Sequence, residues 1–167
     1  MFKAISVREI NKNAIQMIAD EWMLVTAGTE AGWNTMTASW GGLGEMWVKD
    51  VAVTVIRPQR YTYEFIEKTG LFTLSFFGDS QRKALGLCGS KSGREIDKAA
   101  ATGLVPVFED GVTYFEQAEL VLVCQKLYAG DLNPAGFVDP ALAQLHYPNG
   151  DFHRVYVGEI VKTLVKE

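Results

Sequence analysis

The sequence predicts a mainly β, α+β fold: a β-barrel with short helical insertions, formed by a single domain over residues 1–167. Segments with the pattern of strands outnumber amphipathic helical segments, and strands continue to the C-terminus. Strands and helices do not alternate as a parallel βαβ sheet requires. The chain has 167 residues, of which 48% are hydrophobic, which is enough for one core but hardly for two.

The first half of the chain predicts one helix and three strands. The helix is expected over Val7–Glu21, where apolar residues recur every three to four positions and Asn11 and Asn13 can cap. Strands are expected over Trp22–Gly28, Asn34–Trp40 and Val51–Ile56. The glycine cluster at 41–44 is expected to loosen the backbone between the last two strands.

The second half predicts three further helices and three further strands. The helices are expected over Tyr61–Thr69, Gln81–Leu87 and Arg94–Ala101, and the strands over Leu71–Phe77, Ala118–Tyr128 and Arg154–Val165. Gly70 can end the first of these helices with a left-handed cap. Residues 129–150 hold three of the five prolines, which predicts a long surface excursion before the last strand.

Composition argues against several classes of function. A net charge of -4 gives no electrostatic footprint for nucleic acid or for an anionic membrane. No apolar run is long enough to span a membrane and the N-terminus lacks a signal-peptide pattern, so a cytoplasmic protein is expected. The common dinucleotide, nucleotide and hydrolase motifs are absent. We therefore expect neither a nucleic-acid partner nor a membrane protein.

The few cysteines and histidines predict no metal site. Cys88 and Cys124 are the only cysteines, lie far apart and are expected to be reduced thiols. His146 and His153 have no spacing typical of a ligand pair. A surface position for His146 and a strand-edge position for His153 explain these residues without a metal.

A turn with two arginines predicts an anion-binding cradle. In the segment 56–62 a β-branched strand runs into Pro58 and then into a helix whose first turn offers unpaired N–H groups. Arg57 and Arg60 add planar cationic donors, and Thr62 adds a hydroxyl, so a phosphate would fit here. The alternative is that a side chain of this segment only caps the helix while the arginines are solvated.

The strand over residues 34–40 carries small or hydroxylated side chains, which is unusual for a strand that faces a core. Small side chains let a flat ring approach the backbone, Asn34 and the hydroxyls can bond ring heteroatoms, and Trp40 can wall an aromatic ligand. The alternative, left open by this segment alone, is a twisted strand with threonines on a solvent face.

Taken together, these segments resemble the flavin reductase-like family of FMN-binding split barrels, and most closely its flavoredoxin-like branch. The resemblance rests on residues 34–41 and 57–62, continues through 88–89, 92–94 and 97–98, and closes with 153–159. The order and spacing of these pieces agree over nearly the whole chain. The resemblance implies a Greek-key split β-barrel that forms a homodimer, with FMN near the subunit interface.

The resemblance also implies roles for individual residues. It places the strand along the flavin, the arginine turn on the phosphate side and Lys98 within reach of the cofactor, although Lys98 would otherwise pass for an exposed helix residue. The expected cofactor-binding residues are Asn34, Thr35, Met36, Thr37, Ala38, Ser39, Trp40, Arg57, Pro58, Arg60, Tyr61, Thr62, Cys88, Gly89, Ser92 and Lys98. His153 is expected to contact the substrate, as a nicotinamide-contacting histidine does in some relatives. Cys88 is assigned to the flavin neighbourhood only, since packing also explains a lone cysteine.

The leading hypothesis is a flavoprotein oxidoreductase in which FMN accepts electrons from NADH or NADPH and passes them to a second acceptor. The hard chemistry then belongs to the flavin, so no catalytic side chain is expected. One alternative is a flavoredoxin-type electron-transfer carrier that works with a redox partner protein and has little nicotinamide activity. A third is a dimeric barrel that binds some other small molecule. The sequence selects neither the acceptor nor the nicotinamide.

Overall fold

The computed structural model describes all residues, 1–167, and its main feature is one antiparallel sheet of eight strands. The strand order is β3-β2-β6-β9-β10-β5-β4, with β1 paired to β10 beside that path, while β7 and β8 form a separate hairpin. The strands are β1 (Phe2–Ile5), β2 (Met23–Thr29), β3 (Gly32–Ala38), β4 (Gly41–Met46), β5 (Lys49–Ile56), β6 (Leu71–Phe76), β7 (Pro106–Glu109), β8 (Val112–Phe115), β9 (Leu120–Asp131) and β10 (Arg154–Lys166).

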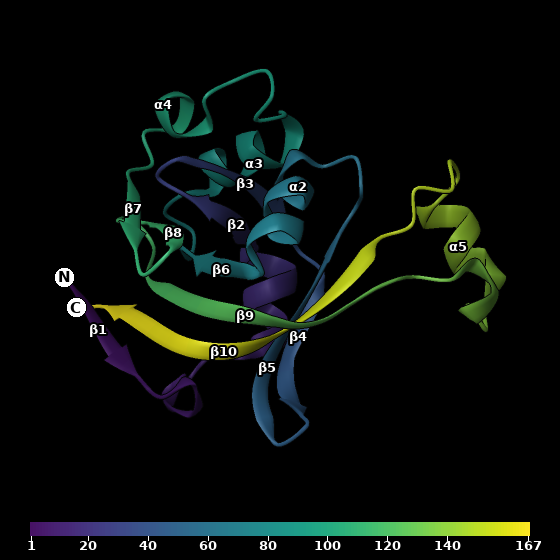
Figure 1. The fold of residues 1–167 in the computed structure, drawn as a ribbon, viewed down its shortest axis with the longest axis horizontal. Coiled ribbons are helices and arrows are strands. Elements are labelled where there is room, and N and C mark those ends of the chain that lie inside the picture. Colours follow the sequence, from purple (N-terminus) through teal and green to yellow (C-terminus); the bar gives the residue numbers. More distant parts are fainter.

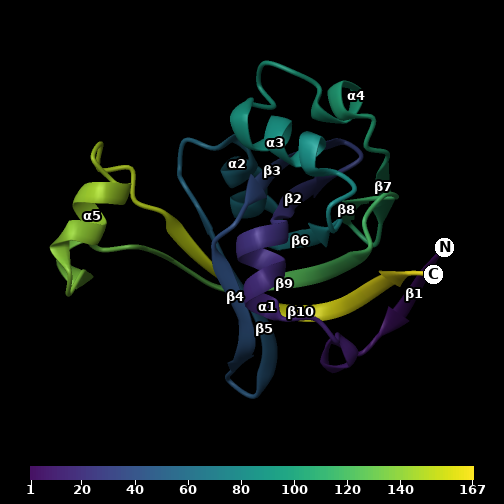
Figure 2. The ribbon, with the colours of Figure 1, turned by 180° about the vertical axis from the view of Figure 1, so that it is seen from behind.

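Five short α-helices accompany the sheet, and none of them is long and apolar enough to cross a membrane. They are α1 (Ala14–Gln16), α2 (Tyr61–Thr69), α3 (Arg82–Ser90), α4 (Lys98–Thr102) and α5 (Pro140–His146). Figure 1 shows α2, α3 and α4 gathered at one end of the sheet, with α5 projecting far to the side. The view from behind places α1 against the sheet near β4 (Figure 2). A mainly antiparallel sheet with short helices confirms the predicted fold class.

Two hydrophobic clusters hold helices α2 and α3 against the strands. The larger one is built on the interior of the sheet and includes Phe72 and Leu74 of β6 with Ile66 of α2. The second joins Leu85 of α3 to Phe115 of β8. Burying side chains of this size stabilises each contact by about 2 kcal/mol, so α2 and α3 are held in fixed positions over β2 and β3.

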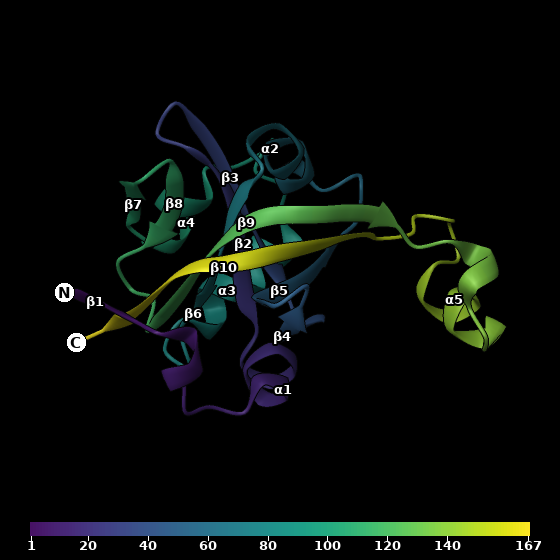
Figure 3. The same ribbon diagram turned by 60° about the horizontal axis from the view of Figure 1, so that its bottom comes forward.

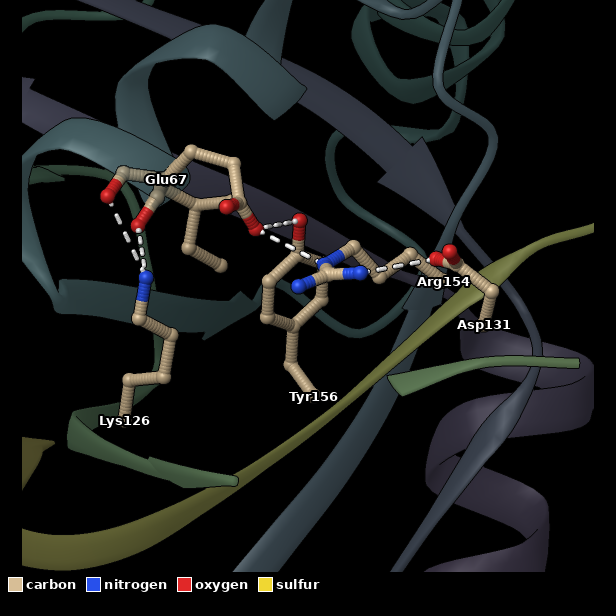
Figure 4. Close-up of polar contacts among 6 residues, drawn as sticks. Glu67, Lys126, Asp131, Arg154 and Tyr156 are labelled. Atoms are coloured by element: carbon tan, nitrogen blue, oxygen red, sulfur yellow. Dashed lines mark hydrogen bonds and ion pairs between the residues drawn. The ribbon is translucent and has the colours of Figure 1, made fainter. Parts of the chain in front are cut away.

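A polar network holds the far end of α2 to the long strands (Figure 4). The Glu67 carboxylate accepts hydrogen bonds from the Tyr156 hydroxyl at 2.7 Å and from Arg154 Nε at 3.0 Å. Arg154 also donates to Asp131 at 2.9 Å, where β9 ends. Lys126 Nζ donates to the carbonyls of Ile66 and Glu67 in the last turn of α2, where a cation is favourable. The helix is therefore anchored at its C-terminal end, away from the segment where it begins.

Most predicted strands are confirmed, as are helix α2 and its left-handed cap at Gly70, where φ is 69°. The predicted helix over Val7–Glu21 was too long. The structure has a 3₁₀ turn at Val7–Glu9, and α1 begins only after Asn13, which caps it as expected and leads into a π-helical turn, Met17–Glu21. The helix expected over Arg94–Ala101 was also wrong in extent, because α4 begins at Lys98 after its Asp97 cap.

The glycine cluster was misinterpreted as a loosening of the backbone, because it forms strand β4. At Gly41 φ is 144°, and an added Cβ would lie 2.2 Å from the carbonyl oxygen of Val53, so only glycine lets β4 approach β5 here. The hairpin turns at Trp47 and Val48, where φ is 56° and 58°. A left-handed conformation is strained for a bulky or β-branched side chain, and both side chains are more than half exposed.

The excursion between β9 and β10, residues 132–153, is called the arm from here on. It contains a 3₁₀ turn, Pro134–Gly136, and helix α5, so it has more structure than the predicted surface loop. Figure 3 shows β9 and β10 running side by side out of the sheet to carry it. The long-range pairing of β1 with β10 and the β7-β8 hairpin were not predicted.

Candidate functional site

Two hollows meet between the arm, the end of β3 and the start of α2. The strand hollow, of about 240 Å³, is lined by Met36, Thr37, Ala38, Ser39, Trp40, Val55, Arg57, Arg60 and His153. The turn hollow, of about 330 Å³, is lined by Asn34, Met36, Arg57, Gln59, Arg60, Tyr61, Thr62, Ser90, Lys91, Ser92, Gly93, Glu95 and Lys98. Since both share Met36, Arg57 and Arg60, they form one continuous cleft.

The strand hollow owes its shape to the small side chains at the end of β3. Ala38 and Ser39 leave the backbone accessible, and Trp40 forms the outer wall with its ring 5.2 Å from that of His153. Thr35 points the other way, because its hydroxyl lies 2.8 Å from that of Thr26 in the core. Met36, Thr37, Ala38 and Ser39 are consecutive and all line the hollow, so both faces at the end of β3 contribute to it.

The turn hollow is built where β3 meets the first turn of α2. The buried Asn34 side chain donates from Nδ2 to the Thr62 hydroxyl at 2.9 Å and more weakly to the Thr35 carbonyl. Gly93 packs directly on this pair, since an added Cβ would lie 1.9 Å from Asn34 Oδ1. The Thr62 hydroxyl therefore bonds Asn34 and does not cap the helix. Thr35 of the strand is buried, so it does not face solvent as the alternative for this strand required.

Arg60 occupies the N-cap position of α2 but makes no side-chain cap. Its Nη1 instead donates to the Gly89 carbonyl at 2.9 Å, which holds the guanidinium along the cleft. In the first turn of α2 the N–H of Tyr63 donates to the Arg60 carbonyl, so the N–H groups of Tyr61 and Thr62 and the positive end of the helix dipole are left for other acceptors. The aromatic ring of Tyr61 closes this end under the guanidinium of Arg94, 4.5 Å away.

Lys98 is the least expected feature of the site, because only 6% of it is exposed. Its ammonium donates to the carbonyls of Thr35 at 2.7 Å and Cys88 at 2.8 Å, tying β3 to α3. An ammonium has three donors, so one remains for the cleft that Lys98 lines. Burial lowers the pKa of Lys98 to about 8, and Arg60 adds to the effect against the opposing influence of Cys88.

Four predicted residues do not line the cleft. Thr35, Cys88 and Gly89 support it through their carbonyls, which accept the bonds from Lys98 and Arg60 described above. Pro58 shapes the turn before α2 without lining either hollow. The Cys88 thiol is fully buried, and this burial raises its pKa although Lys98 opposes the shift, so packing explains the residue.

Arg57 and His153 bring the arm to the cleft. Arg57 lines both hollows, while its guanidinium bonds the carbonyl of His146 and the carboxylate of Asp151 in the arm. His153 directly precedes β10, at the strand edge as expected, and is buried; its Nδ1 lies 2.7 Å from the Tyr147 hydroxyl. Burial lowers the pKa of His153 to about 4, with Arg57 and Arg60 contributing and Asp151 opposing, so the imidazole is neutral at pH 7.

Sequence reasoning missed six lining residues: Val55, Gln59, Ser90, Lys91, Gly93 and Glu95. Three of them, Lys91, Gly93 and Glu95, belong to the loop after α3, and Ser90 ends that helix. The glycine and serine content of this segment marks a loop but not its proximity to α2. Contact between these segments is set by the bond from Arg60 to Gly89, which no local pattern reveals.

The cleft favours an anionic ligand at one end. The turn hollow is lined by Arg57, Arg60, Lys91 and Lys98 against the single acid Glu95. Cationic donors beside a helix N-terminus are the arrangement that proteins use for phosphate. No group of three or more His, Cys, Asp or Glu side chains is placed to share a metal ion. The strand hollow, with small side chains and aromatic walls, offers a different environment that suits a flat ring.

Comparison with solved structures shows the same fold in three proteins. An FMN-binding domain of a flavin reductase-like enzyme from Shewanella baltica has a TM-score of 0.70 at 18% identity, over 99% of this chain and 77% of that one. Flavoredoxin from Methanosarcina acetivorans has a TM-score of 0.68 at 19% identity, over 88% and 69%. An NADH:FAD oxidoreductase from Streptomyces globisporus has a TM-score of 0.64 at 16% identity, over 87% and 75%.

The split barrel predicted for this chain is therefore confirmed at the level of the fold. No curated protein sequence matches the chain significantly. The model of the flavin reductase-like domain, however, matches residues 16–167, which include every element that lines the cleft. On this match, the chain belongs to the flavin reductase-like domain family.

Proposed function

We propose that this chain binds FMN in the cleft and works as an oxidoreductase that passes electrons from NADH or NADPH through FMN to a second acceptor. The observation that carries the proposal is the junction of a cationic hollow with a hollow of small and aromatic residues at Met36, Arg57 and Arg60. A phosphorylated flavin has the same two-part character. Membership of the family and the FMN-binding description of the Shewanella baltica domain support the choice of ligand.

The residues present fit FMN by their donor chemistry. Arg60, the first turn of α2 and the loop at Ser92 would hold the phosphate, while the strand from Met36 to Trp40 would lie along the ring. The third donor of Lys98 is left for an acceptor in the cleft, which a flavin or its phosphate would supply.

When bound, FMN would supply the hydride and electron-transfer chemistry, so no side chain needs to act as a general base. The chain positions the ring, excludes water with Trp40, and presents a neutral His153 as a hydrogen-bonding group beside the strand hollow. A neutral imidazole can face an electron donor without adding a charge to the site. This is why His153 is proposed as a contact for the nicotinamide.

The test of FMN binding is a fluorescence titration of purified protein with FMN. Arg60→Ala removes a charged donor, so the dissociation constant is expected to rise about tenfold to a hundredfold. Arg82→Ala is the matched control, because Arg82 stacks on Trp22 at 3.4 Å and does not line the cleft. A wild-type protein that stays colourless after incubation with FMN and gel filtration would support a binding module for another small molecule instead.

A second candidate is an electron-transfer carrier that works with a redox partner protein, which the similarity to flavoredoxin favours. The two functions separate when the holoprotein is mixed anaerobically with NADH or NADPH and flavin absorbance is followed. Fast loss of the flavin absorbance identifies a reductase, whereas almost no loss identifies a carrier.

The arm supports a proposal of homodimerisation. Val138 is fully exposed and Leu145 is 72% exposed, so the arm presents apolar side chains that a second copy of the chain would cover. Sedimentation equilibrium tests this, with Leu145→Asp expected to shift the protein towards the monomer. A wild-type monomer at micromolar concentration would contradict it.

A further inference from the structure

The arm leaves the sheet at Asp131 and returns at Arg154, and both faces of its base are held by arginines. On the face away from the cleft, Arg154 bridges Asp131 and Glu67, as Figure 4 shows. On the cleft face, Arg57 forms an ion pair with Asp151. The arm therefore does not hang freely from its two strands, and Arg57–Asp151 is the pair whose arginine lines the cleft.

The Arg57 guanidinium is committed to the arm. Its Nη1 donates to the carboxylate of Asp151 at 2.5 Å and to the carbonyl of the same residue at 3.2 Å. Its Nη2 donates to the His146 carbonyl at 2.9 Å, and the group lies over the Tyr147 ring at 4.9 Å. Every hydrogen bond that the Arg57 side chain makes within the protein thus goes to the arm.

A third group joins this contact from the turn before α2. Gln59 Nε2 donates to the same Asp151 oxygen at 2.9 Å. Hydrogen bonds from Gln59 and Arg57 hold the pKa of Asp151 below its ordinary value. The side chains of Arg57 and Asp151 are each about one quarter exposed, at 23% and 24%, so solvent screens this pair less than a fully exposed one.

The pair lies next to the residues that form the outer wall of the strand hollow. Asp151 and His153 are two residues apart, and His153 is bonded to Tyr147 on the other side of the same contact. The rings of His153 and His146 each lie 5.2 Å from that of Trp40. Release of Asp151 would loosen the segment between the two histidines, which then keeps the bonds from Arg57 to the His146 carbonyl and from Leu132 to the His153 carbonyl. The turn hollow and its cations would stay in place on α2 and α3.

We propose that the Arg57–Asp151 pair is a latch that fixes the arm, so that His153 and Trp40 form the mouth through which the electron donor reaches the strand hollow. Arg57 is then a positioning residue for the donor, and the grip on the cofactor phosphate rests on Arg60, α2 and Lys98. The part of this inference that concerns the donor rests on the proposed function.

Asp151→Asn tests the latch, because Asp151 lines neither hollow. Asp151→Glu keeps the charge and is the rescue variant. Asp131→Asn is the matched control, since it removes a carboxylate from the base of the same arm on the other face. The three variants are compared with the wild type in three measurements: the pKa of His153 by NMR without cofactor, the dissociation constant of FMN, and rapid-reaction reduction of bound FMN by NADH and NADPH.

The His153 titration gives opposite results for the two possibilities. Burial is the largest cause of its low pKa of about 4, while the negative charge of Asp151 acts to raise it. If Asp151→Asn opens the arm, His153 gains water and its pKa rises towards 6.5. If the arm stays closed, loss of the Asp151 charge lowers the pKa further. Loss of the Asp151 charge alone therefore cannot produce the rise in the His153 pKa that opening of the arm produces.

With a latch, Asp151→Asn raises the His153 pKa and raises the dissociation constant of the nicotinamide about tenfold, with FMN affinity changed less than twofold. Asp151→Glu recovers much of the nicotinamide affinity, and Asp131→Asn behaves as the wild type. An unchanged or lowered His153 pKa in Asp151→Asn overturns the latch. So does a loss of FMN affinity equal to the loss of nicotinamide affinity, which would make the pair part of the cofactor site. A wild type that does not bind FMN overturns the proposed function instead, and the His153 titration then decides the latch alone.

Discussion

Asn34 and Thr62 are joined by a hydrogen bond of 2.9 Å between two buried side chains, one at the start of the small-residue part of β3 and one in the first turn of α2. This bond sets the distance between the strand and the helix start. The two segments that the sequence marked as ring and phosphate sites become a single cleft because of it.

Thr62→Val removes the acceptor of this bond while keeping the volume of the side chain. The buried Asn34 amide then loses its best partner, so the free energy of unfolding is expected to fall by about 1–3 kcal/mol. FMN affinity is expected to fall as well, because the first turn of α2 shifts against β3. Urea denaturation and FMN titration measure the two effects. Thr62→Ser keeps the hydroxyl and should retain most of both quantities; equal losses in the two variants would show that the bond has no role.

Gly93→Ala is expected to damage the site through sterics alone. Its Cβ would lie 1.9 Å from Asn34 Oδ1, so either the loop after α3 or the Asn34 side chain must move. Weaker FMN binding by about tenfold is the expected result, measured by fluorescence titration. Gly86→Ala is the control, because nothing lies within 4 Å of its added Cβ in the middle of α3. That variant should bind FMN normally and gain about 0.5–1 kcal/mol of stability.

FMN affinity is expected to fall as pH rises above about 8, because the Lys98 ammonium, whose third donor is proposed to reach FMN, then loses its proton. The dissociation constant should rise by up to about tenfold per pH unit from that point. Titrations between pH 7 and pH 10 give the profile. Lys98→Arg retains the positive charge over this range. Its FMN dissociation constant should therefore change little with pH, whatever the value at pH 7. A wild-type profile that is flat from pH 7 to pH 10 would remove Lys98 from the cofactor contacts.

The free energy of unfolding is expected to decrease as pH is lowered from about 6.5 to about 4, because of His153. Its pKa is about 6.5 when the chain is unfolded and about 4 when it is folded, so in this window the unfolded chain binds a proton that the folded chain excludes. The loss approaches about 3 kcal/mol at pH 4. Urea midpoints at pH 7 and pH 4.5 measure it against His153→Gln, in which this contribution should vanish. His146→Gln should keep the full pH dependence, and an identical dependence in both variants would contradict the assignment.

The sequence predicted the parts of the site whose signal is local. The small residues from Ala38 to Trp40 and the arginine turn before α2 depend on side-chain size and on neighbours in the chain, and both line the cleft. The cap at Gly70 was predictable for the same reason, because a helix that ends in glycine has a local signature.

The rest required contacts between distant residues. Composition alone made Lys98 an exposed helix residue, and only resemblance placed it near the cofactor, because its burial depends on carbonyls of Thr35 and Cys88. The partner of Arg57 is 94 positions away in the arm. Strand β4 was missed because glycines normally weaken strands, whereas here Gly41 permits the close approach of Val53.

The hairpin turn at Trp47 and Val48 has a practical consequence. Strand β5 separates this tip from the turn at Arg57 by eight residues, or about 25 Å of extended chain. Its two residues adopt a strained left-handed conformation. Neither of them lines the cleft. A fluorescent dye or an affinity tag attached at this tip would therefore report on the protein, or immobilise it, with the flavin cleft left untouched.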